Sequence, residues 1–167
     1  MDLYEKLAEL AAAKLAPGRL CLAYSGQFYL SEVMERMSQH LTYWWTFALE
    51  FSGSHCAIHP RHIQNKWKPI VAFAKPKVKP APEWLSDHLA GGGRDKDYHD
   101  WGQDESEVEY LINRLTQPGD LIVDPFCGGG AVPAACKSVG RRWLATEIDK
   151  TTAMIARKRL AEAGKPK

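Results

Sequence analysis

Residues 120–149 read DLIVDPFCGGGAVPAACKSVGRRWLATEID, and they contain the pattern from which we infer the fold. Two short apolar runs, at 120–126 and 141–148, predict strands, and the segments at 130–139 and 150–163 have helical periodicity. Strand, helix, strand and helix in this order form a βαβ unit with parallel strands. Because helices bury the strands of such units, the sequence predicts an α/β fold with a layered sheet.

Further elements follow from the same criteria. Helices are predicted at 3–16, 31–40 and 105–115, and strands at 19–25, 42–51 and 68–76. Residues 52–67 and 76–104 are polar and irregular, so we expect two long loops there. The prediction is a single domain over 1–167 with about five strands. It has a first half at 1–76, an irregular loop at 77–104 and a second half at 105–167.

Composition places the chain among ordinary globular proteins. It has 167 residues, of which 45% are hydrophobic and 25% are charged. No apolar run approaches the roughly 18 residues of a membrane span, and no signal-peptide pattern is present. We therefore expect a soluble, cytoplasmic protein without a membrane partner. A net charge of +2 excludes a wholesale electrostatic attraction to nucleic acid, although lysines concentrate between 66 and 79.

The turn at 124–130 suits a ligand at the edge of the sheet. Its glycines allow close approach and positive φ angles, and open α/β sheets bind ligands at the carboxyl ends of their strands. Glu147 closes the second strand about 20 residues further on, where an acid can accept both hydroxyls of a ribose. The alternative is an ordinary strand–turn–helix without a ligand, which the combination of acid, glycines and second acid disfavours.

The spacing also selects the cofactor. The glycines are contiguous, Val132-Pro133 stands where a nicotinamide fingerprint needs its third glycine, and no phosphate-binding P-loop occurs. Asp124 would repel a pyrophosphate but attract the sulfonium and amino groups of S-adenosylmethionine (SAM). The sequence therefore predicts a SAM pocket, and its predicted residues are Asp124, Pro125, Phe126, Cys127, Gly128, Gly130 and Glu147.

The run DPFCGGG, followed by Gly140-Arg141-Arg142 and Glu147-Ile148-Asp149, resembles the amino-methylating DNA methyltransferases, which act on adenine N6 or cytosine N4. In the circularly permuted group of this family the target-base half comes first and the SAM motif lies near the C-terminus, which is the order found here. The resemblance implies a three-layer Rossmann-like fold, SAM as cofactor and double-stranded DNA as partner. The implied reaction is methyl transfer to an exocyclic amine of a flipped base.

Two further segments carry the resemblance and its site residues. HDWGQDESEVEYLINRLTQPGDLIVDPF resembles the segment in which a polar residue contacts the methionine end of SAM, which assigns Gln103, with His99 and Trp101 as weaker candidates. NKWKPIVAFAKP resembles the strand with a lysine- and tryptophan-containing motif. Its nucleic-acid-binding candidates are Lys66, Trp67 and Lys68.

A histidine- and cysteine-containing cluster invites a zinc hypothesis. His55, Cys56, His59 and His62 lie within eight residues, but their spacing matches no zinc-finger frame and no second ligand pair lies elsewhere. We therefore expect a polar loop and no metal.

One departure from the family affects catalysis. The family carries a tetrapeptide of the form [DNS]-P-P-[YFW], which accepts hydrogen bonds from the target amine and stacks on the base, whereas no Pro-Pro dipeptide occurs in these 167 residues. No catalytic residue is therefore assigned. We expect the sheet to lack its central strand, which would lie between the strands predicted at 120–126 and 19–25. A homo-oligomer, a complementing chain or a rearranged sheet would then cover the gap. Two alternatives remain: an inactive SAM-binding remnant or half of a split enzyme, and a methyltransferase for RNA or a small molecule.

Overall fold

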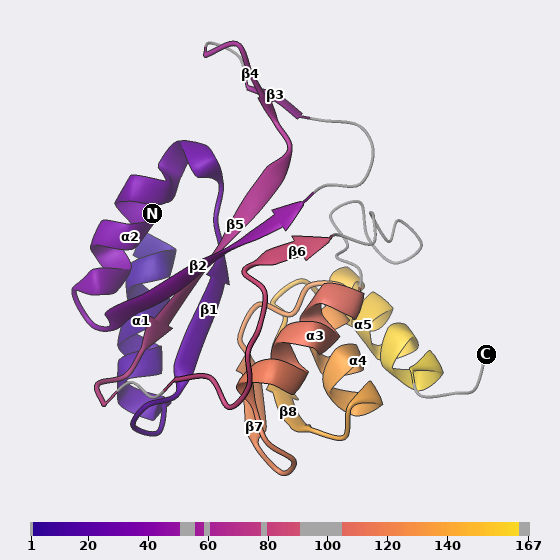
Figure 1. Ribbon diagram of the computed structural model, residues 1–167. Coiled ribbons are helices and arrows are strands. Elements are labelled where there is room, and N and C mark those ends of the chain that lie inside the picture. The colour runs from indigo at the N-terminus through magenta and orange to yellow at the C-terminus, as the bar shows by residue number, and fades with distance from the viewer. Residues whose placement is uncertain (1, 51–55, 59–60, 78–79, 91–104, 164–167) are drawn as a thin grey trace. The chain divides into compact units, whose positions relative to one another are not determined.

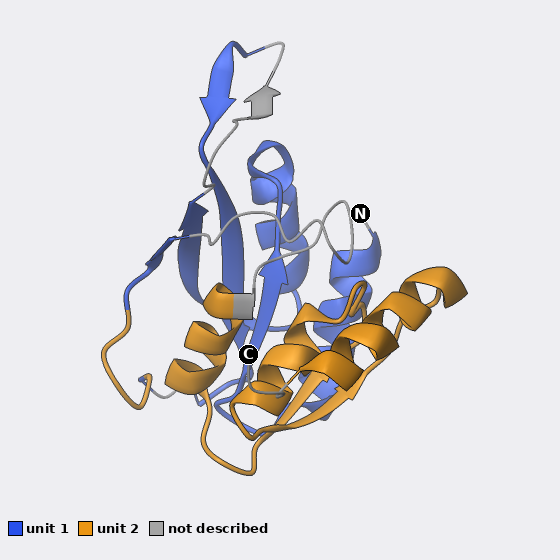
Figure 2. Cartoon of the chain, turned by 90° about the vertical axis from the view of Figure 1, so that its right-hand side faces the viewer, with its two compact units in different colours: residues 1–80, 86–90 blue, residues 81–85, 91–167 orange. Residues whose placement is uncertain are grey.

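The computed structural model describes residues 2–50, 56–58, 61–77, 80–90 and 105–163 (Figure 1). The chain divides into two compact units, which Figure 2 distinguishes by colour. The first unit comprises residues 1–80 and 86–90, and the second comprises residues 81–85 and 91–167. The change of unit falls within the loop predicted at 77–104. Whether the two units act as one domain stays a prediction.

The first unit contains two α-helices, one 3-10 helix and six strands in its described residues. They are α1 (Asp2–Lys14), β1 (Leu20–Tyr24), η1 (Gln27–Tyr29), α2 (Leu30–Ser38), β2 (Thr42–Glu50), β3 (Cys56–Ile58), β4 (Ile63–Asn65), β5 (Trp67–Ala74) and β6 (His88–Ala90). The two helices and the strands β1, β2 and β5 lie where the sequence predicts them.

A four-stranded sheet in the order β1-β5-β2-β6 forms the centre of the first unit. The central strand β5 pairs antiparallel with both β1 and β2, and residues 70–74 of this strand are at most 1% exposed. Its Phe73 and the neighbouring Cys21 of β1 pack against Val33 and Met37 of α2 and Ala8 of α1. These side chains form one continuous core between the two helices and one face of the sheet.

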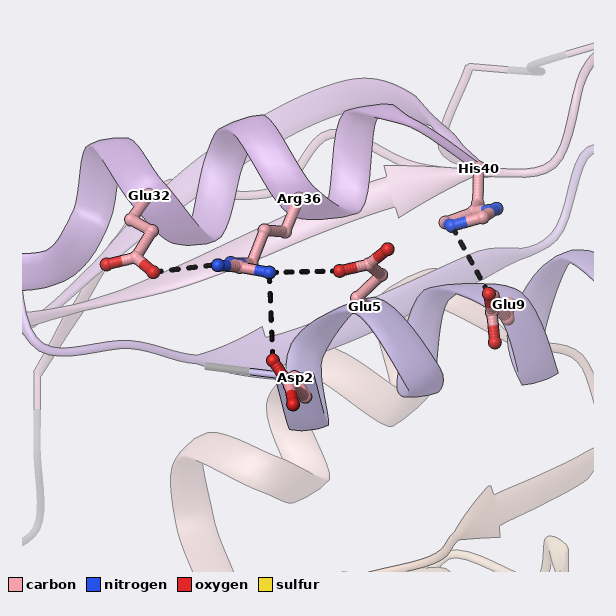
Figure 3. Close-up of polar contacts among 6 residues, drawn as sticks. All are labelled: Asp2, Glu5, Glu9, Glu32, Arg36 and His40. Carbon is pink, nitrogen blue, oxygen red and sulfur yellow. Dashed lines mark hydrogen bonds and ion pairs between the residues drawn. The ribbon is translucent and has the colours of Figure 1, made fainter.

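Ion pairs join α1 to α2 beside this core (Figure 3). The Arg36 guanidinium of α2 lies 3.0 Å from Glu5 of α1 and 3.2 Å from Glu32, one turn earlier on its own helix. His40, just after α2, places Nε2 3.8 Å from Glu9 of α1. Partly exposed pairs of this kind are individually weak, but together they favour one alignment of the two helices.

The prediction of two structureless loops is wrong in part. β3 and β4 form an antiparallel hairpin within 52–67, and β6 pairs parallel with β2 within 76–104. The segment before β6 is anchored by Asp87, whose C=O accepts the Ala48 N–H at 2.7 Å and whose carboxylate accepts the Trp45 indole N–H at 3.0 Å. The structure therefore adds three strands, β3, β4 and β6, to the expected number of about five. Each has only three residues, which is too short to show an alternating pattern in the sequence.

The second unit contains the predicted strand–helix–strand–helix series. Its elements are α3 (Glu105–Leu115), β7 (Leu121–Asp124), α4 (Ala131–Ser138), β8 (Arg142–Ala145) and α5 (Lys150–Glu162). β7 and β8 are parallel, as predicted. Val108 and Ile112 of α3 pack against Ala135 and Cys136 of α4, and Ile122 of β7 packs against the same cluster.

Burial of this strand pair differs from the prediction. Leu121 and Val123 alternate with Ile122 and so lie on the opposite face of β7, where they are 51% and 54% exposed. Leu144 of β8, next to Val123 in register, is 56% exposed. α4 covers one face of the pair, and the apolar residues of the other face remain about half exposed. Within the described ranges, no helix has the length and apolar character needed to cross a membrane.

The strands on either side of the expected missing strand do not pair with each other. Among the described strands β1 pairs only with β5, and β7 pairs only with β8, so each has a partner on one side. The two belong to separate sheets of four and two strands. Each therefore retains one edge at which a further strand can add.

Candidate cofactor-binding site

The glycine-rich turn joins β7 to α4, and two of its glycines have backbone angles that disfavour other residues. Gly128 has φ 49° and Gly130 has φ 83°, both in the left-handed region. A Cβ on Gly130 would lie 3.0 Å from Ala156 of α5, so packing also requires glycine there. A Cβ on Gly128 would meet nothing within 4 Å. Open space therefore lies beside Gly128, where a ligand can approach the backbone.

The Glu147 carboxylate lies directly against this turn. Its Oε2 accepts the Gly128 N–H at 2.9 Å, and its Oε1 accepts the Asp149 N–H at 2.9 Å. Because β7 and β8 are parallel and Asp124 pairs with Ala145, both acids lie at the same edge of the sheet. An ionised carboxylate has about four acceptor positions, so two backbone bonds leave capacity for two ribose hydroxyls. The structure thus brings the Glu147 carboxylate and the glycine turn together.

The Asp124 carboxylate, at the end of β7, lies in an environment that disfavours its negative charge. Burial raises the pKa of Asp124, and the negative charge of Glu147 raises it further, against the lowering effect of the Phe126 N–H. That N–H donates to the Asp124 carboxylate at 3.1 Å. A bound cation would offset both the burial of Asp124 and its repulsion from Glu147. The site therefore suits a positively charged ligand, such as one with a sulfonium and an amino group.

Cys127 is not a nucleophile in this arrangement. Burial raises the pKa of its thiol, and the charges of Asp124 and Glu147 raise it further. The thiol therefore stays protonated at neutral pH, whereas nucleophilic attack requires the thiolate. Within the turn Cys127 has a structural role, because its C=O accepts the Gly130 N–H at 2.8 Å.

Thr146 holds the turn through three hydrogen bonds that sequence reasoning missed. Its N–H donates to the C=O of Asp124 at 3.0 Å, its hydroxyl donates to the C=O of Pro125 at 2.8 Å, and its C=O accepts the Cys127 N–H at 3.0 Å. The only signal in the sequence was a polar residue between an apolar strand and the acid. Pro125 and Cys127 are therefore fixed by Thr146.

Apolar side chains flank the two acids. Phe126 is 52% exposed, and Ile148, directly after Glu147, is 99% exposed. Ile148 directly follows the acid that lies against the glycine turn, which makes its exposed side chain a candidate contact for a ligand bound there. Sequence reasoning named Phe126 but not Ile148, although an apolar residue directly after the acid was a usable signal.

The other predicted site residues divide into two groups. Gln103, Trp101 and His99 lie outside the described residues. Lys66, Trp67 and Lys68 lie in the first unit, where Trp67 is 36% exposed and the Lys68 amino group lies 4.6 Å from the centre of the Tyr24 ring. The structure therefore brings together the cofactor residues of the turn and Glu147, whereas the nucleic-acid candidates belong to the other unit.

The part of the chain that contains this turn is similar to known DNA methylases. The sequence profile N6_N4_Mtase, described as DNA methylase, matches residues 84–158. Type II methyltransferase M2.DpnII of Streptococcus pneumoniae is 43% identical over 56 residues, which are 31% of this chain and 21% of that protein. Type II methyltransferase M.HpaI of Haemophilus parainfluenzae is 27% identical over 83 residues, which are 50% of this chain and 26% of that protein. The matches span about a quarter of these relatives.

Solved structures share the fold over nearly the whole chain. A crystal structure of an M1.HpyAVI–SAM complex matches with a TM-score of 0.80 at 20% identity, over 95% of this chain and 82% of that one. The cytosine-N4-specific PvuII DNA methyltransferase matches with a TM-score of 0.79 at 17% identity, over 99% and 72%. These likenesses confirm the predicted Rossmann-like α/β fold. Residues 84–158, which include the glycine turn and Glu147, are the part of this chain that matches the family model described as DNA methylase.

Proposed function

We propose that this chain provides the SAM-binding and base-facing parts of a DNA methyltransferase acting on an exocyclic amine, adenine N6 or cytosine N4. The hydrogen bond from Gly128 to Glu147 carries the proposal, because it joins the predicted ribose acid to the glycine turn beside Asp124. The match of residues 84–158 to the DNA methylase family supports it.

Each residue of the site has a proposed task. Glu147 accepts the two ribose hydroxyls of SAM, and Asp124 attracts the positive charge of the ligand. Phe126 and Ile148, both exposed, contact the faces of the adenine ring. Gln103, with Trp101 and His99 as weaker candidates, contacts the methionine end.

The proposed reaction is a displacement at the SAM methyl carbon. SAM held by these residues would supply a methyl group on a positively charged sulfur. The amine nitrogen would accept this methyl group, the sulfur would keep the electron pair of the broken bond, and an acceptor in the protein would take the proton that the nitrogen loses. Because the amine lone pair is delocalised into the ring, acceptors at its two protons must favour a tetrahedral nitrogen. The base must also be held out of the stack against a cost of a few kcal/mol.

The resemblance assigns these last two tasks to the [DNS]-P-P-[YFW] tetrapeptide, which these 167 residues do not contain. We therefore propose that the acceptors come from other residues, in a longer form of the protein, a complementing chain or a homo-oligomer. The single-sided pairing of β1 and of β7 supports the addition of such a strand. The proposed substrate is double-stranded DNA, and the proposed location is the cytoplasm.

Transfer of tritium from methyl-labelled SAM to unmethylated genomic DNA tests this function. The chain is assayed alone and as a fusion in which a strand ending in [DNS]-P-P-[YFW] precedes α1. We expect label in DNA only with the fusion, and none when the fusion carries Glu147→Ala. A fusion that binds SAM but transfers no label would contradict the proposed reaction. Transfer by the chain alone would mean that another group accepts the amine protons.

A further inference from the structure

Three aromatic residues lie close together in sequence where β1 ends. Tyr24 is the last residue of β1, and Phe28 and Tyr29 belong to the 3-10 helix that follows. The rings of Phe28 and Tyr29 meet edge to face, with centroids 5.1 Å apart and an interplanar angle of 69°. These two side chains nevertheless remain 46% and 54% exposed. Adjacent exposed rings of this size are typical of an interaction surface.

Two cations pack over these rings. The guanidinium carbon of Arg61 lies 4.7 Å from the centre of the Phe28 ring, and the amino nitrogen of Lys68 lies 4.6 Å from the centre of the Tyr24 ring. They come from different segments, the turn between β3 and β4 and the start of β5. Because Tyr24 pairs with Ile70 of β5, the end of β1 lies beside the start of β5, from which the β3–β4 hairpin extends (Figure 1).

We propose that these five residues form a DNA-contact surface in which the exposed rings stack on an unpaired base and the two cations bind phosphates. Nucleic acid matches both features, because its backbone is negatively charged and every base has a π-face on which an aromatic ring can stack. The proposal rests on the proposed DNA methyltransferase function. Of the five residues, only Lys68 belongs to the nucleic-acid-binding residues predicted from the sequence.

Stacking on a base has a specific consequence. A continuous duplex hides its base faces, whereas a mismatched base leaves the stack at lower cost. This surface should therefore bind a duplex with one mismatched pair more tightly than the fully paired duplex. Loss of a ring should remove this preference, and loss of a cation should reduce the salt dependence of binding.

Fluorescence anisotropy with the whole chain and two labelled duplexes, one matched and one with a single mismatch, tests these consequences. Phe28→Leu keeps apolar bulk but removes the π-face, and Tyr43→Leu is the matched control, because Tyr43 lies on β2 and is 44% exposed. We expect Phe28→Leu to weaken binding of the mismatched duplex about fivefold or more at an unchanged salt slope. Arg61→Gln should lower the slope of log affinity against log salt by about 0.9. Tyr43→Leu should change neither quantity.

Several outcomes would overturn the proposal. The wild type could show no DNA affinity at low salt, or the wild type and Phe28→Leu could bind the mismatched duplex equally well. A third such outcome is that Phe28→Leu changes the sedimentation of the chain but not its DNA binding, which would assign the rings to a contact between copies of the chain. If Phe28→Leu does not fold, Tyr29→Leu provides the same comparison. SAM affinity of the same preparations separates the two proposals. If the chain binds SAM but its DNA binding does not depend on Phe28, only the proposed DNA-contact surface is refuted. If DNA binding depends on Phe28 but the chain does not bind SAM, only the proposed function is refuted.

Discussion

Replacing Gly130 by alanine is expected to destabilise the second unit by about 2 to 5 kcal/mol. Gly130 has φ 83°, and a residue with a Cβ pays roughly 1–2 kcal/mol in this left-handed conformation. The new Cβ would also lie 3.0 Å from both Cα and Cβ of Ala156. Since Cα belongs to the backbone of α5, the helix itself must shift, and overpacking of this kind costs about 1–3 kcal/mol.

Two other glycines separate these contributions. Gly119 has φ 86°, but its Cβ would meet nothing within 4 Å, so Gly119→Ala should lose only the roughly 1–2 kcal/mol of backbone strain. Gly26 has φ −82° and open space around it, so Gly26→Ala should be neutral or stabilising by up to about 1 kcal/mol. The expected order of stability is therefore Gly26→Ala, then Gly119→Ala, then Gly130→Ala.

Equilibrium unfolding in urea, followed by tryptophan fluorescence and circular dichroism, measures this order. Coincident transitions by the two probes would show that each free energy refers to one transition. Equal stabilities of Gly130→Ala and Gly119→Ala would refute the close packing of α5 against the glycine turn. Equal stabilities of all three variants would refute the left-handed backbone as well.

Two further predictions concern the cofactor site. Burial raises the pKa of Asp124 in the native state above its value in the unfolded chain. Between these two pKa values the native state binds a proton that the unfolded chain has lost, so the free energy of unfolding falls as the pH rises through this range. Asp124→Asn should therefore raise the thermal midpoint of the unliganded chain at neutral pH and weaken SAM binding, and a lower midpoint would contradict the burial of this carboxylate. Ile148→Asn should change the free energy of unfolding by no more than about 0.5 kcal/mol, because the side chain is 99% exposed. It should nevertheless weaken SAM severalfold in equilibrium dialysis, and unchanged SAM affinity would remove Ile148 from the site.

The elements of the cofactor half were predictable because each has a strong local signal. β7 is an apolar run that ends in an acid, α4 follows a glycine turn, and β8 is the next apolar run. Local pattern and tertiary structure agree there. The carboxyl ends of parallel strands meet at one edge, so the proximity of Asp124 and Glu147 could also be expected before the structure.

The missed features depend on partners far away in the sequence. β6 has three residues, and its position follows from hydrogen bonds of Asp87 with Trp45 and Ala48 some 40 residues earlier. The half-exposed face of β7 was equally unpredictable, because a buried and an exposed apolar strand have the same local pattern. The positions of Gln103, Trp101 and His99 stay predictions.

Isothermal titration of SAM into the chain tests most directly whether the glycine turn and Glu147 form a cofactor site. Glu147→Gln removes the charge that would bind the ribose, and Glu109→Gln, in α3 of the same unit and similarly half-buried, is the matched control for loss of a carboxylate. A hydrogen bond to a charged group contributes on the order of 1.5–3 kcal/mol, so Glu147→Gln should weaken SAM roughly tenfold or more, and Glu109→Gln should bind like the wild type. Equal SAM affinity of the wild type and Glu147→Gln would contradict the proposed site.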